Sequence, residues 1–403
     1  MSACPSSPIT LLAERSDAVP DAVNLIAQAP AAEDLLVALL AVSDPRKSRG
    51  VRHRLLTVLA AGVCAVLAGA RSYVMIAEWA HDLPVSVRLR LGMGRCAPSE
   101  STIRRILQRV DPDELDTAVS GWLARRVTGP SSAGPSSTGG PVRAVALDGK
   151  SARGSRSGEG RAVHLLGALD HASGVVLGQT AVDAKTNEIT AFAPLLDRID
   201  AACPLAGAVI TADALHTQHA HADWLHARGA HYVFIAKGNQ PTLHAQLADL
   251  PWSAIPVVDD IRGRGHGRVE TRTLQLCTIA AGIGFPHARL AARIIRRRRP
   301  TSSKKGSTET IYAVTSLGLD DVRADRLAEI IRGHWHIENR LHWVRDVVFA
   351  EDLSQIRTGN GPATMAVLRN FAISRHRLSG ATNIAEACRD TGRHPLRAVD
   401  LLT

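Results

Sequence analysis

Three observations predict an α/β fold for this chain of 403 residues. Helical periodicity fills the first part of the chain. A stretch rich in Gly, Pro and Ser follows it, and short apolar strands begin directly afterwards. These strands come in the order of three hairpin-linked strands, helix, strand, helix, strand, which is typical of a ribonuclease H-like core rather than a doubly wound sheet. The sequence therefore predicts a ribonuclease H-like core with a β-rich insertion, preceded by a helical N-terminal domain.

The composition is that of a globular protein with a basic surface. Hydrophobic residues make up 45% and charged residues 21% of the chain, which excludes a disordered or fibrous protein. Aromatic residues are only 3%, which argues against a sugar-binding cleft or a base-stacking surface. The formal charge of +10 suits a polyanion such as nucleic acid. Coding bias is an alternative explanation of that charge, because 42 of the 48 basic residues are arginine.

The cysteines and the apolar runs bear on location. The six cysteines are too far apart for a CxxC metal knuckle or a dense disulfide framework, which favours a reducing compartment. The first twenty residues lack the charged flank and apolar run of a secretory signal. The longest apolar run, Leu55 to Ala70, is sixteen residues long and short for a membrane span. We expect a buried helix there, no membrane partner and a cytoplasmic protein.

The sequence predicts helices in the N-terminal part, up to about residue 128. Apolar residues recur at steps of three and four, as in Ile103, Ile106, Leu107 and Val110. The helix that begins after Ser99 carries several arginines and is either a DNA-facing element or a solvated helix face. We expect residues 1–128 to form a helical DNA-binding domain and residues 129–141, almost wholly Gly, Pro, Ser and Thr, to form a flexible linker.

Residues 142–403 are expected to form the catalytic domain. Its predicted strands alternate with one helix capped by Asn187 or Thr186 and a second helix through Trp224 and Leu225. The predicted strands are Val142–Leu147, Val163–Leu169, Val175–Val182, Ala208–Thr211 and Tyr232–Ala236.

From about residue 250 to 318 the pattern changes to glycine-punctuated β segments, including Arg268–Leu274 and Thr310–Thr315. Between residues 261 and 305 this insertion carries twelve Arg or Lys and a single acidic residue, Glu270. A solvated loop is the simpler explanation, but that asymmetry exceeds what solubility needs, so we favour contact with phosphates.

Two aspartates stand at the ends of predicted strands. Asp148 follows the first strand and Asp213 the fourth, and these strands are neighbours in the predicted order. A single aspartate at a strand end is usually a turn former. Two carboxylates brought this close repel each other unless a cation lies between them, so the pair predicts a cation site.

The helix predicted from Ala324 to Val348 offers a third acid. Glu338 lies seven residues after Ile331 and is therefore predicted on the buried face, where an unpaired carboxylate requires a metal or a cation. His334, His342 and Arg345 share that face and could hold a phosphate or orient a water. An internal Glu–Arg pair without catalysis is the alternative. The rival acids lie off this face or beyond the helix end: Asp346, Glu351 and Asp352.

Two Asp and one Glu suit Mg²⁺ or Mn²⁺ rather than zinc. The chemistry that requires such a site is displacement at a phosphodiester, with two ions serving the attacking and leaving oxygens. The histidines between His216 and His231 match no zinc motif and are interpreted as surface residues. The glycines from Gly263 to Gly267 lack the GK[ST] ending of a phosphate loop and predict a basic β turn.

From about Asp44 to Ile373 the chain resembles the DDE insertion-sequence transposases of the H-repeat-associated (ISAs) type. The resemblance rests on an ordered set of motifs: Asp44-Pro45-Arg46, Arg52-His53, Leu67-Ala68-Gly69-Ala70, Pro98-Ser99-x-Ser101-Thr102-Ile103, Leu147-Asp148-Gly149-Lys150, Ile210 to Gln218, Tyr232 to Gln240, His266-Gly267-Arg268-Val269-Glu270-x-Arg272 and Arg332-x-His334-Trp335-x-Ile337-Glu338-Asn339-x-Leu341-His342-Trp343.

The resemblance implies that Asp148, Asp213 and Glu338 are the catalytic and metal-binding triad. It also implies two Mg²⁺ or Mn²⁺ ions, and DNA partners in the form of terminal inverted repeats and target DNA. The positions where the wider superfamily has Tyr, Arg and Lys around the Glu hold Ile331, His334 and Arg345 here. The residues expected to contact DNA are Lys150, Lys237, Asn239, Gln240, His266, Arg268, Arg272, Arg332, His334, His342 and Arg345.

A transposase that cleaves and joins strands is the resulting prediction, as a homodimer or higher oligomer in a synaptic complex associated with the bacterial nucleoid. Two alternatives remain open. A decayed or domesticated transposase would act only as a sequence-specific DNA-binding protein, and a stand-alone metal-dependent nuclease would cut without joining.

Overall fold

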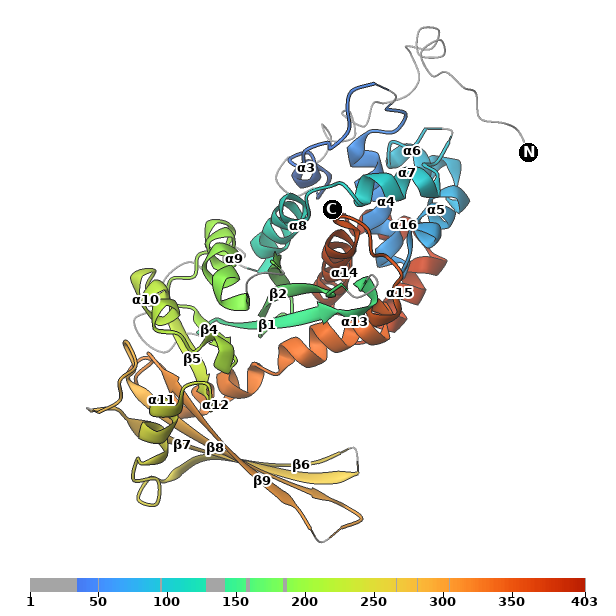
Figure 1. Ribbon diagram of the computed structural model, residues 1–403. Coiled ribbons are helices and arrows are strands. Elements are labelled where there is room, and N and C mark those ends of the chain that lie inside the picture. The colour runs from blue at the N-terminus through green and yellow to red at the C-terminus, as the bar shows by residue number, and fades with distance from the viewer. Residues whose placement is uncertain are drawn as a thin grey trace.

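A computed structural model describes residues 35–49, 51–94, 96–127, 142–156, 160–183, 187–265, 267–280, 282–303 and 305–402 (Figure 1). The linker expected at 129–141 lies outside the described residues, as do Thr186 and His266.

One mixed sheet runs through the C-terminal part of the chain. In the described residues it has nine strands in the order β3-β2-β1-β4-β5-β9-β8-β7-β6. The first three strands are antiparallel, whereas β4 pairs parallel with both β1 and β5. The expected contact between the first and fourth strands is therefore confirmed. The strands are β1 Ala144–Ala152, β2 Val163–Asp170, β3 Val176–Val182, β4 Val209–Ala212, β5 His231–Ala236, β6 Val257–Gly265, β7 Arg268–Thr278, β8 Leu290–Pro300 and β9 Ser307–Thr315.

The predicted strands of this core are found within a few residues of their expected positions, but β1 continues past Asp148 to Ala152. Asp148 thus lies inside a strand rather than at its end, because β2 pairs with β1 along this extension, from Asp148↔Gly167 to Ala152↔Val163. The helices between the strands are α9 Glu188–Ala202, α10 His219–Ala227 and α11 Pro241–Ala248.

The predicted insertion adds four antiparallel strands to the edge of the core sheet. β9 pairs with β5, and β8, β7 and β6 follow outwards. The sequence indicated parts of β7 and β9 but not β6 or β8, whose polar and arginine-rich patterns do not alternate cleanly with apolar residues. In Figure 1 these strands form a long twisted arm that projects from the rest of the molecule.

Helices make up the N-terminal part, as predicted. The apolar run from Leu55 forms the buried helix α4, and Ile103, Ile106 and Leu107 face the core from α7. No helix in the described part of the chain is long and apolar enough to cross a membrane. These helices are α3 Leu35–Leu39, α4 Leu55–Leu67, α5 Tyr73–Asp82, α6 Val85–Arg90, α7 Glu100–Leu107 and α8 Pro112–Val127.

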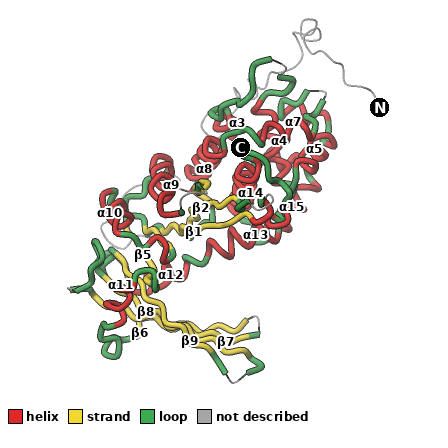
Figure 2. Tube along the Cα trace, viewed as in Figure 1, coloured by secondary structure: helices red, strands yellow, loops and turns green. Residues whose placement is uncertain are grey.

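The C-terminal helices connect this helical region with the sheet. Among them, α14 contacts α4 and α8 of the helical region and also β3 of the sheet (Figure 2). One cluster of buried apolar residues extends through both regions. The C-terminal helices are α12 Ala324–Gly333, α13 Trp343–Val347, α14 Gly361–Leu378, α15 Ile384–Arg393 and α16 Pro395–Asp400.

The helix predicted from Ala324 to Val348 is not uniform. The amides of Trp335 and Ile337 make tight i→i−3 hydrogen bonds after α12, and a π-helical turn over Glu338–His342 follows before α13. In that turn the Trp343 N–H donates to the Glu338 carbonyl five residues back. Such irregular turns change the angular position of the side chains that follow and are common at functional sites.

Candidate active site

Asp148 and Asp213 lie at one edge of the sheet, the place where the parallel pairing of β1 with β4 ends. Leu147 of β1 pairs with Ala212 of β4, so the aspartate that follows each of them lies at this edge. The carboxylate of Asp213 caps the short 3₁₀ turn Ala214–His216 by accepting a hydrogen bond from the Leu215 N–H at 2.9 Å. The strand order predicted from the sequence thus brings the two acids to neighbouring positions.

Glu338 reaches this edge from the irregular helix. The sequence placed Glu338 on the buried face, and this prediction is wrong: its side chain is 57% exposed. The buried stripe runs through Ile330 and, seven residues later, Ile337, which is fully buried, whereas the prediction was counted from Ile331. Glu338 follows Ile337 and is therefore turned about 100° around the helix from that buried position.

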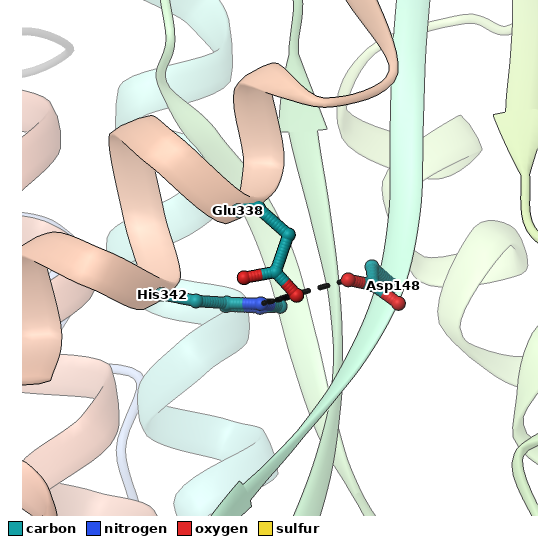
Figure 3. A group of neighbouring side chains, drawn as sticks. All are labelled: Asp148, Glu338 and His342. Carbon is teal, nitrogen blue, oxygen red and sulfur yellow. Dashed lines mark ion pairs between the residues drawn. The ribbon is translucent and has the colours of Figure 1, made fainter. Parts of the chain in front are cut away.

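The Glu338 carboxylate meets Asp148 and His342 (Figure 3). One ligand atom from each of the three residues lies within 4.8 Å of the other two. The Nδ1 atom of His342 lies 3.5 Å from Glu338 Oε1 and 3.6 Å from Asp148 Oδ2. Asp148, Glu338 and His342 are called the close group below. Asp213 lies outside this group, but its negative charge raises the pKa of Asp148.

The electrostatics of the group favour a cation. Burial, followed by the negative charges of Glu338, Asp213 and Glu188, raises the pKa of Asp148 to about 8. The hydrogen bond with His342 lowers the pKa of Glu338, although its partial burial opposes that shift. Burial lowers the pKa of His342, which favours the neutral imidazole. An acid with a raised pKa beside an ionised one is the expected result when carboxylates converge without a cation.

A fourth carboxylate, Glu188, was not predicted. It is the first residue of α9, and its oxygens accept hydrogen bonds from His164 Nε2 at 2.6 Å and His216 Nε2 at 3.3 Å. Burial on its own would raise the pKa of Glu188, but these hydrogen bonds lower it to about 2. The signal was weak, because an acid in the first turn of a helix is commonly a helix-dipole partner.

The same contacts correct the interpretation of the histidines after Asp213. His216 and His221 are buried rather than on the surface. The His221 ring stacks on Phe192 at 3.8 Å between centroids, and His216 faces Glu188. Irregular spacing along the sequence suggested surface positions because it does not show which side chains turn inward after a strand.

Arg345 is not available to DNA. Its side chain is 2% exposed and its guanidinium forms an ion pair with Glu351 at 2.8 Å. Arg369 of α14 forms a second ion pair with Glu351 at 2.9 Å. The prediction that Arg345 holds a phosphate is therefore wrong. A helix without its irregular turns would have placed Arg345 beside Glu338, whereas the observed chain directs it to Glu351.

The other cations predicted near the triad divide into buried and exposed residues. Lys150 is nearly buried and its Nζ lies 2.7 Å from Asp346 Oδ2. His334 is largely covered, and its Nδ1 lies 3.2 Å from Thr211 Oγ1. Lys237 is exposed just after β5, at the same edge of the sheet as Asp213. Of these three, only Lys237 presents its charge to solvent.

Asn239 and Gln240 support the turn that carries Asp213. Asn239 Nδ2 donates to the Ala214 carbonyl at 2.6 Å, and Gln240 Nε2 donates to the Thr217 carbonyl at 2.8 Å. Their amides are therefore engaged with this turn, although the sequence predicted that they contact DNA.

The arginines of the arm fall on two faces. On one face, four arginines surround Glu270 at 2.5–3.8 Å, and Arg332 of α12 forms an ion pair with Asp259. The cross-strand register Arg262–Thr271–Arg297 and Arg264–Val269–Arg299 defines the opposite face. The arginines around Glu270 are Arg268, Arg272, Arg296 and Arg298.

The opposite face is referred to below as the free arginine face and consists of Arg262, Arg264, Arg297 and Arg299. All four are exposed, and no ion pair joins them to an acid among the residues that the structure describes. Unpaired guanidinium groups in a row on an exposed β surface are suited to phosphate contact.

The close group suits a hard divalent cation. Its oxygen donors come from two carboxylates, Asp148 and Glu338, and a third carboxylate, Asp213, lies beside them. Carboxylate oxygens are the preferred ligands of Mg²⁺, whereas Mn²⁺ also accepts an imidazole such as that of His342. Burial and the negative charges of Glu338, Asp213 and Glu188 together raise the pKa of Asp148, and a cation bound beside it would offset both effects.

Comparison with known proteins identifies the family of the chain. Residues 140–375 match the family model described as "Transposase DDE domain", and residues 36–123 match the model described as "DDE_Tnp_1-associated". "Putative transposase YncI" of Escherichia coli O157:H7 is 29% identical over 85% of this chain and 87% of its own length. "H repeat-associated putative transposase YhhI" of Escherichia coli K12 is 28% identical over 83% and 87%.

Among solved structures, a piggyBac transposase synaptic complex with hairpin DNA is similar over 95% of this chain and 81% of that chain. The sequence identity is 10% and the TM-score 0.39, a likeness too low to bear on the fold. The family model covers more than half of the chain. The chain therefore belongs to the transposase DDE domain family, with the H repeat-associated transposases among its relatives.

Proposed function

We propose that this protein is an active transposase that cleaves DNA at the ends of an insertion sequence and transfers the cut strands. The observation that carries the proposal is the convergence of the Asp148 and Glu338 carboxylates, which come from distant parts of the sequence. Carboxylates this close repel each other unless a cation lies between them, and the cost is greater for Asp148, whose side chain is only 21% exposed. A site that exists only for structure would have enclosed a basic side chain, as the protein does around Glu351.

In this proposal the five strands β1 to β5 form a ribonuclease H-like core. The antiparallel β1–β2–β3 unit beside parallel β4 and β5 has the strand order expected for that fold. This order brings the ends of β4 and β5 to the edge where Asp148 lies, so acids and Lys237 share one surface.

Asp148, Asp213 and Glu338 would hold the divalent ions, two Mg²⁺ or Mn²⁺, with Asp148 between the other two acids. When bound, such ions supply an activated water or 3′-hydroxyl and stabilise the leaving oxygen. His342 contributes by orienting the exposed Glu338 side chain, which it contacts through Nδ1. Asn239 and Gln240 fix the turn in which Asp213 lies, so that its carboxylate keeps its place at the sheet edge.

The DNA would lie across the exposed side of this edge. Lys237 is exposed beside the acids, and the free arginine face offers four further cations on the arm. The helical region of residues 35–127 would bind the terminal repeats, with Arg104, Arg105 and Arg109 on α7 and just after it. Pairing of two ends in a synapse requires a dimer or larger oligomer.

The test is cleavage of an oligonucleotide duplex that carries the element's own end. We expect Asp148→Asn and Glu338→Gln to abolish Mg²⁺-dependent cleavage and to leave DNA binding intact. Asp352→Asn is the control, because Asp352 is a nearby acid that accepts a hydrogen bond from the Arg153 N–H outside the close group. Full cleavage by either triad variant would overturn the proposal.

The alternatives give different results in the same assay. A protein kept only for regulation would bind DNA in a salt-sensitive manner without nicking it in Mg²⁺ or Mn²⁺. A stand-alone nuclease would cut the end without joining it to a target.

A further inference from the structure

Glu188 lies outside the close group but packs against the strand that carries Asp148. Its carboxylate lies against the backbone of β1 at Gly149, the residue that follows Asp148. A Cβ added to Gly149 would be only 2.2 Å from Glu188 Oε1 and 2.3 Å from its Cδ. Glycine at position 149 is therefore what lets the Glu188 carboxylate approach the strand that carries Asp148.

Three parts of the site meet at this carboxylate. His164 comes from β2, the antiparallel partner of β1, and its ring is held on the other side by Ser151 Oγ at 2.9 Å. His216 comes from the short turn that Asp213 caps and is fully buried. Glu188 thus links the strand of Asp148 to the turn of Asp213 through one side chain.

The charge of Glu188 acts on the site as well as its hydrogen bonds. Its side chain is only 15% exposed, so water screens it weakly, and its negative charge acts on Asp148. A carboxylate at this position strengthens the attraction for a divalent cation.

We propose that Glu188 is a positioning residue of the metal site, which joins Asp148 and Asp213 and adds negative charge beside them without itself ligating the ion. That carboxylate is held in place by hydrogen bonds with His164 and His216 and by the space that Gly149 leaves for it. The inference rests on the proposed function, because it assumes that the close group binds a divalent ion. Groups that orient metal ligands typically contribute tenfold to a hundredfold in metal affinity.

The test is Mn²⁺ binding to the DNA-free protein, measured by electron paramagnetic resonance of free Mn²⁺. Glu188→Gln keeps the size and an acceptor oxygen of the side chain but removes its charge. We expect this variant to bind Mn²⁺ at least about tenfold more weakly than the wild type under conditions where circular dichroism shows it to be folded. Its urea unfolding midpoint should also fall, because the lowered pKa of Glu188 means that its charge stabilises the fold. A purely structural role would leave the Mn²⁺ affinity unchanged in a folded Glu188→Gln protein.

Glu386→Gln is the matched control. Glu386 also lies in the first turn of a helix, α15, behind an Asn cap, but it is exposed and remote from the close group. We expect it to bind Mn²⁺ like the wild type. Equal loss in Glu386→Gln and Glu188→Gln would overturn the inference, since it would show a general effect of helix-terminal charge.

Gly149→Ala gives a second route that does not depend on the stability of the Glu188 variant. The added methyl should displace the Glu188 carboxylate, and Mn²⁺ affinity should fall by a similar factor. When Gly149→Ala is combined with Glu188→Ala, the methyl added at position 149 no longer meets a carboxylate. This double variant should therefore bind Mn²⁺ like Glu188→Ala alone. Additive losses in the double variant would overturn the inference.

Asp148→Asn distinguishes a failure of the proposed metal site from a failure of the proposed role of Glu188. If the wild type and Asp148→Asn bind Mn²⁺ equally, the proposed function fails and the role of Glu188 fails with it. If Asp148→Asn loses binding while Glu188→Gln and Gly149→Ala both remain within twofold of the wild type, only the inference about Glu188 is overturned.

Discussion

Glu338 and Glu351 are thirteen residues apart and are surrounded in opposite ways. Glu351 is 1% exposed and lies between Arg345 and Arg369, so the protein supplies the cations that its burial requires. Glu338 is more than half exposed and faces Asp148, another acid. We infer that Glu351, which has internal cations, is structural. Glu338, which meets another acid, is the one available to an ion from solution.

The same difference separates the two faces of the arm. Four arginines on one face share ion pairs with Glu270, whereas those of the free arginine face have no acidic partner in the described part of the chain. Charges that the protein balances internally hold the fold together. Charges that it leaves unbalanced indicate where metal and DNA would bind.

The largest expected effect concerns the fold. Glu351→Gln leaves Arg345 and Arg369 buried without a counter-charge and should lower the free energy of unfolding by about 3–5 kcal/mol. Glu338→Gln removes a largely exposed charge and should change it by about 0.5 kcal/mol or less. Urea unfolding of the two variants checks both values. Similar losses of unfolding free energy in Glu351→Gln and Glu338→Gln would contradict the difference between the two acids.

The next effect concerns pH. A divalent ion must displace the proton that the raised pKa keeps on Asp148, so metal binding is favoured as the pH rises. The affinity for Mn²⁺ should therefore fall by up to about tenfold per pH unit as the pH is lowered from 8 to 6. Calorimetric titration at several pH values measures this slope, and a flat profile would contradict it.

A smaller effect is a gain of stability on removal of a candidate catalytic acid. Because its folded pKa lies above its unfolded value, Asp148 destabilises the metal-free fold once the pH exceeds the unfolded pKa, and the cost grows until the folded pKa is reached. Asp148→Asn should raise the free energy of unfolding by about 1–3 kcal/mol at pH 8 in EDTA, and by progressively less towards pH 4. Destabilisation at pH 8 would argue against the crowding of acids described here.

The smallest effect concerns the arm. Arg297→Ala with Arg299→Ala should weaken DNA binding and lower the slope of log K against log salt by about 2, since each lost phosphate contact removes about 0.9. Arg296→Ala with Arg298→Ala removes the same charge from the face paired with Glu270 and should change the slope less. Fluorescence anisotropy in a salt series compares them, and equal slopes for the two pairs would contradict a single DNA-facing side.

The strand order was predictable because the order of the elements along the chain is typical of a ribonuclease H-like core, in which the first and fourth strands are neighbours. Hairpin signals and apolar runs marked the five core strands, and their order placed Asp148 beside Asp213, as the parallel pairing of β1 with β4 confirms. The strands β6 and β8 were not indicated, because their exposed arginines carry no apolar alternation. Their place in the sheet is determined by pairing with β7 and β9, which a local pattern does not show.

The surroundings of the acids were less predictable than their identity. The buried position of Glu338 was counted from Ile331 and was wrong, because the stripe through Ile330 buries Ile337 instead. The place of Arg345 beside Glu338 was wrong because a π-helical turn lies between them. Glu188 was missed because its role depends on contacts with β1, β2 and the turn after β4. Such contacts between distant segments leave no periodic signal in the sequence.

A crystal of the protein soaked in Mn²⁺ and measured at the manganese absorption edge would locate the metal site directly. We expect an anomalous difference peak between the carboxylates of Asp148 and Glu338, and loss of this peak in Glu338→Gln. A peak elsewhere, or none at saturating Mn²⁺ with both side chains ordered, would contradict this expectation.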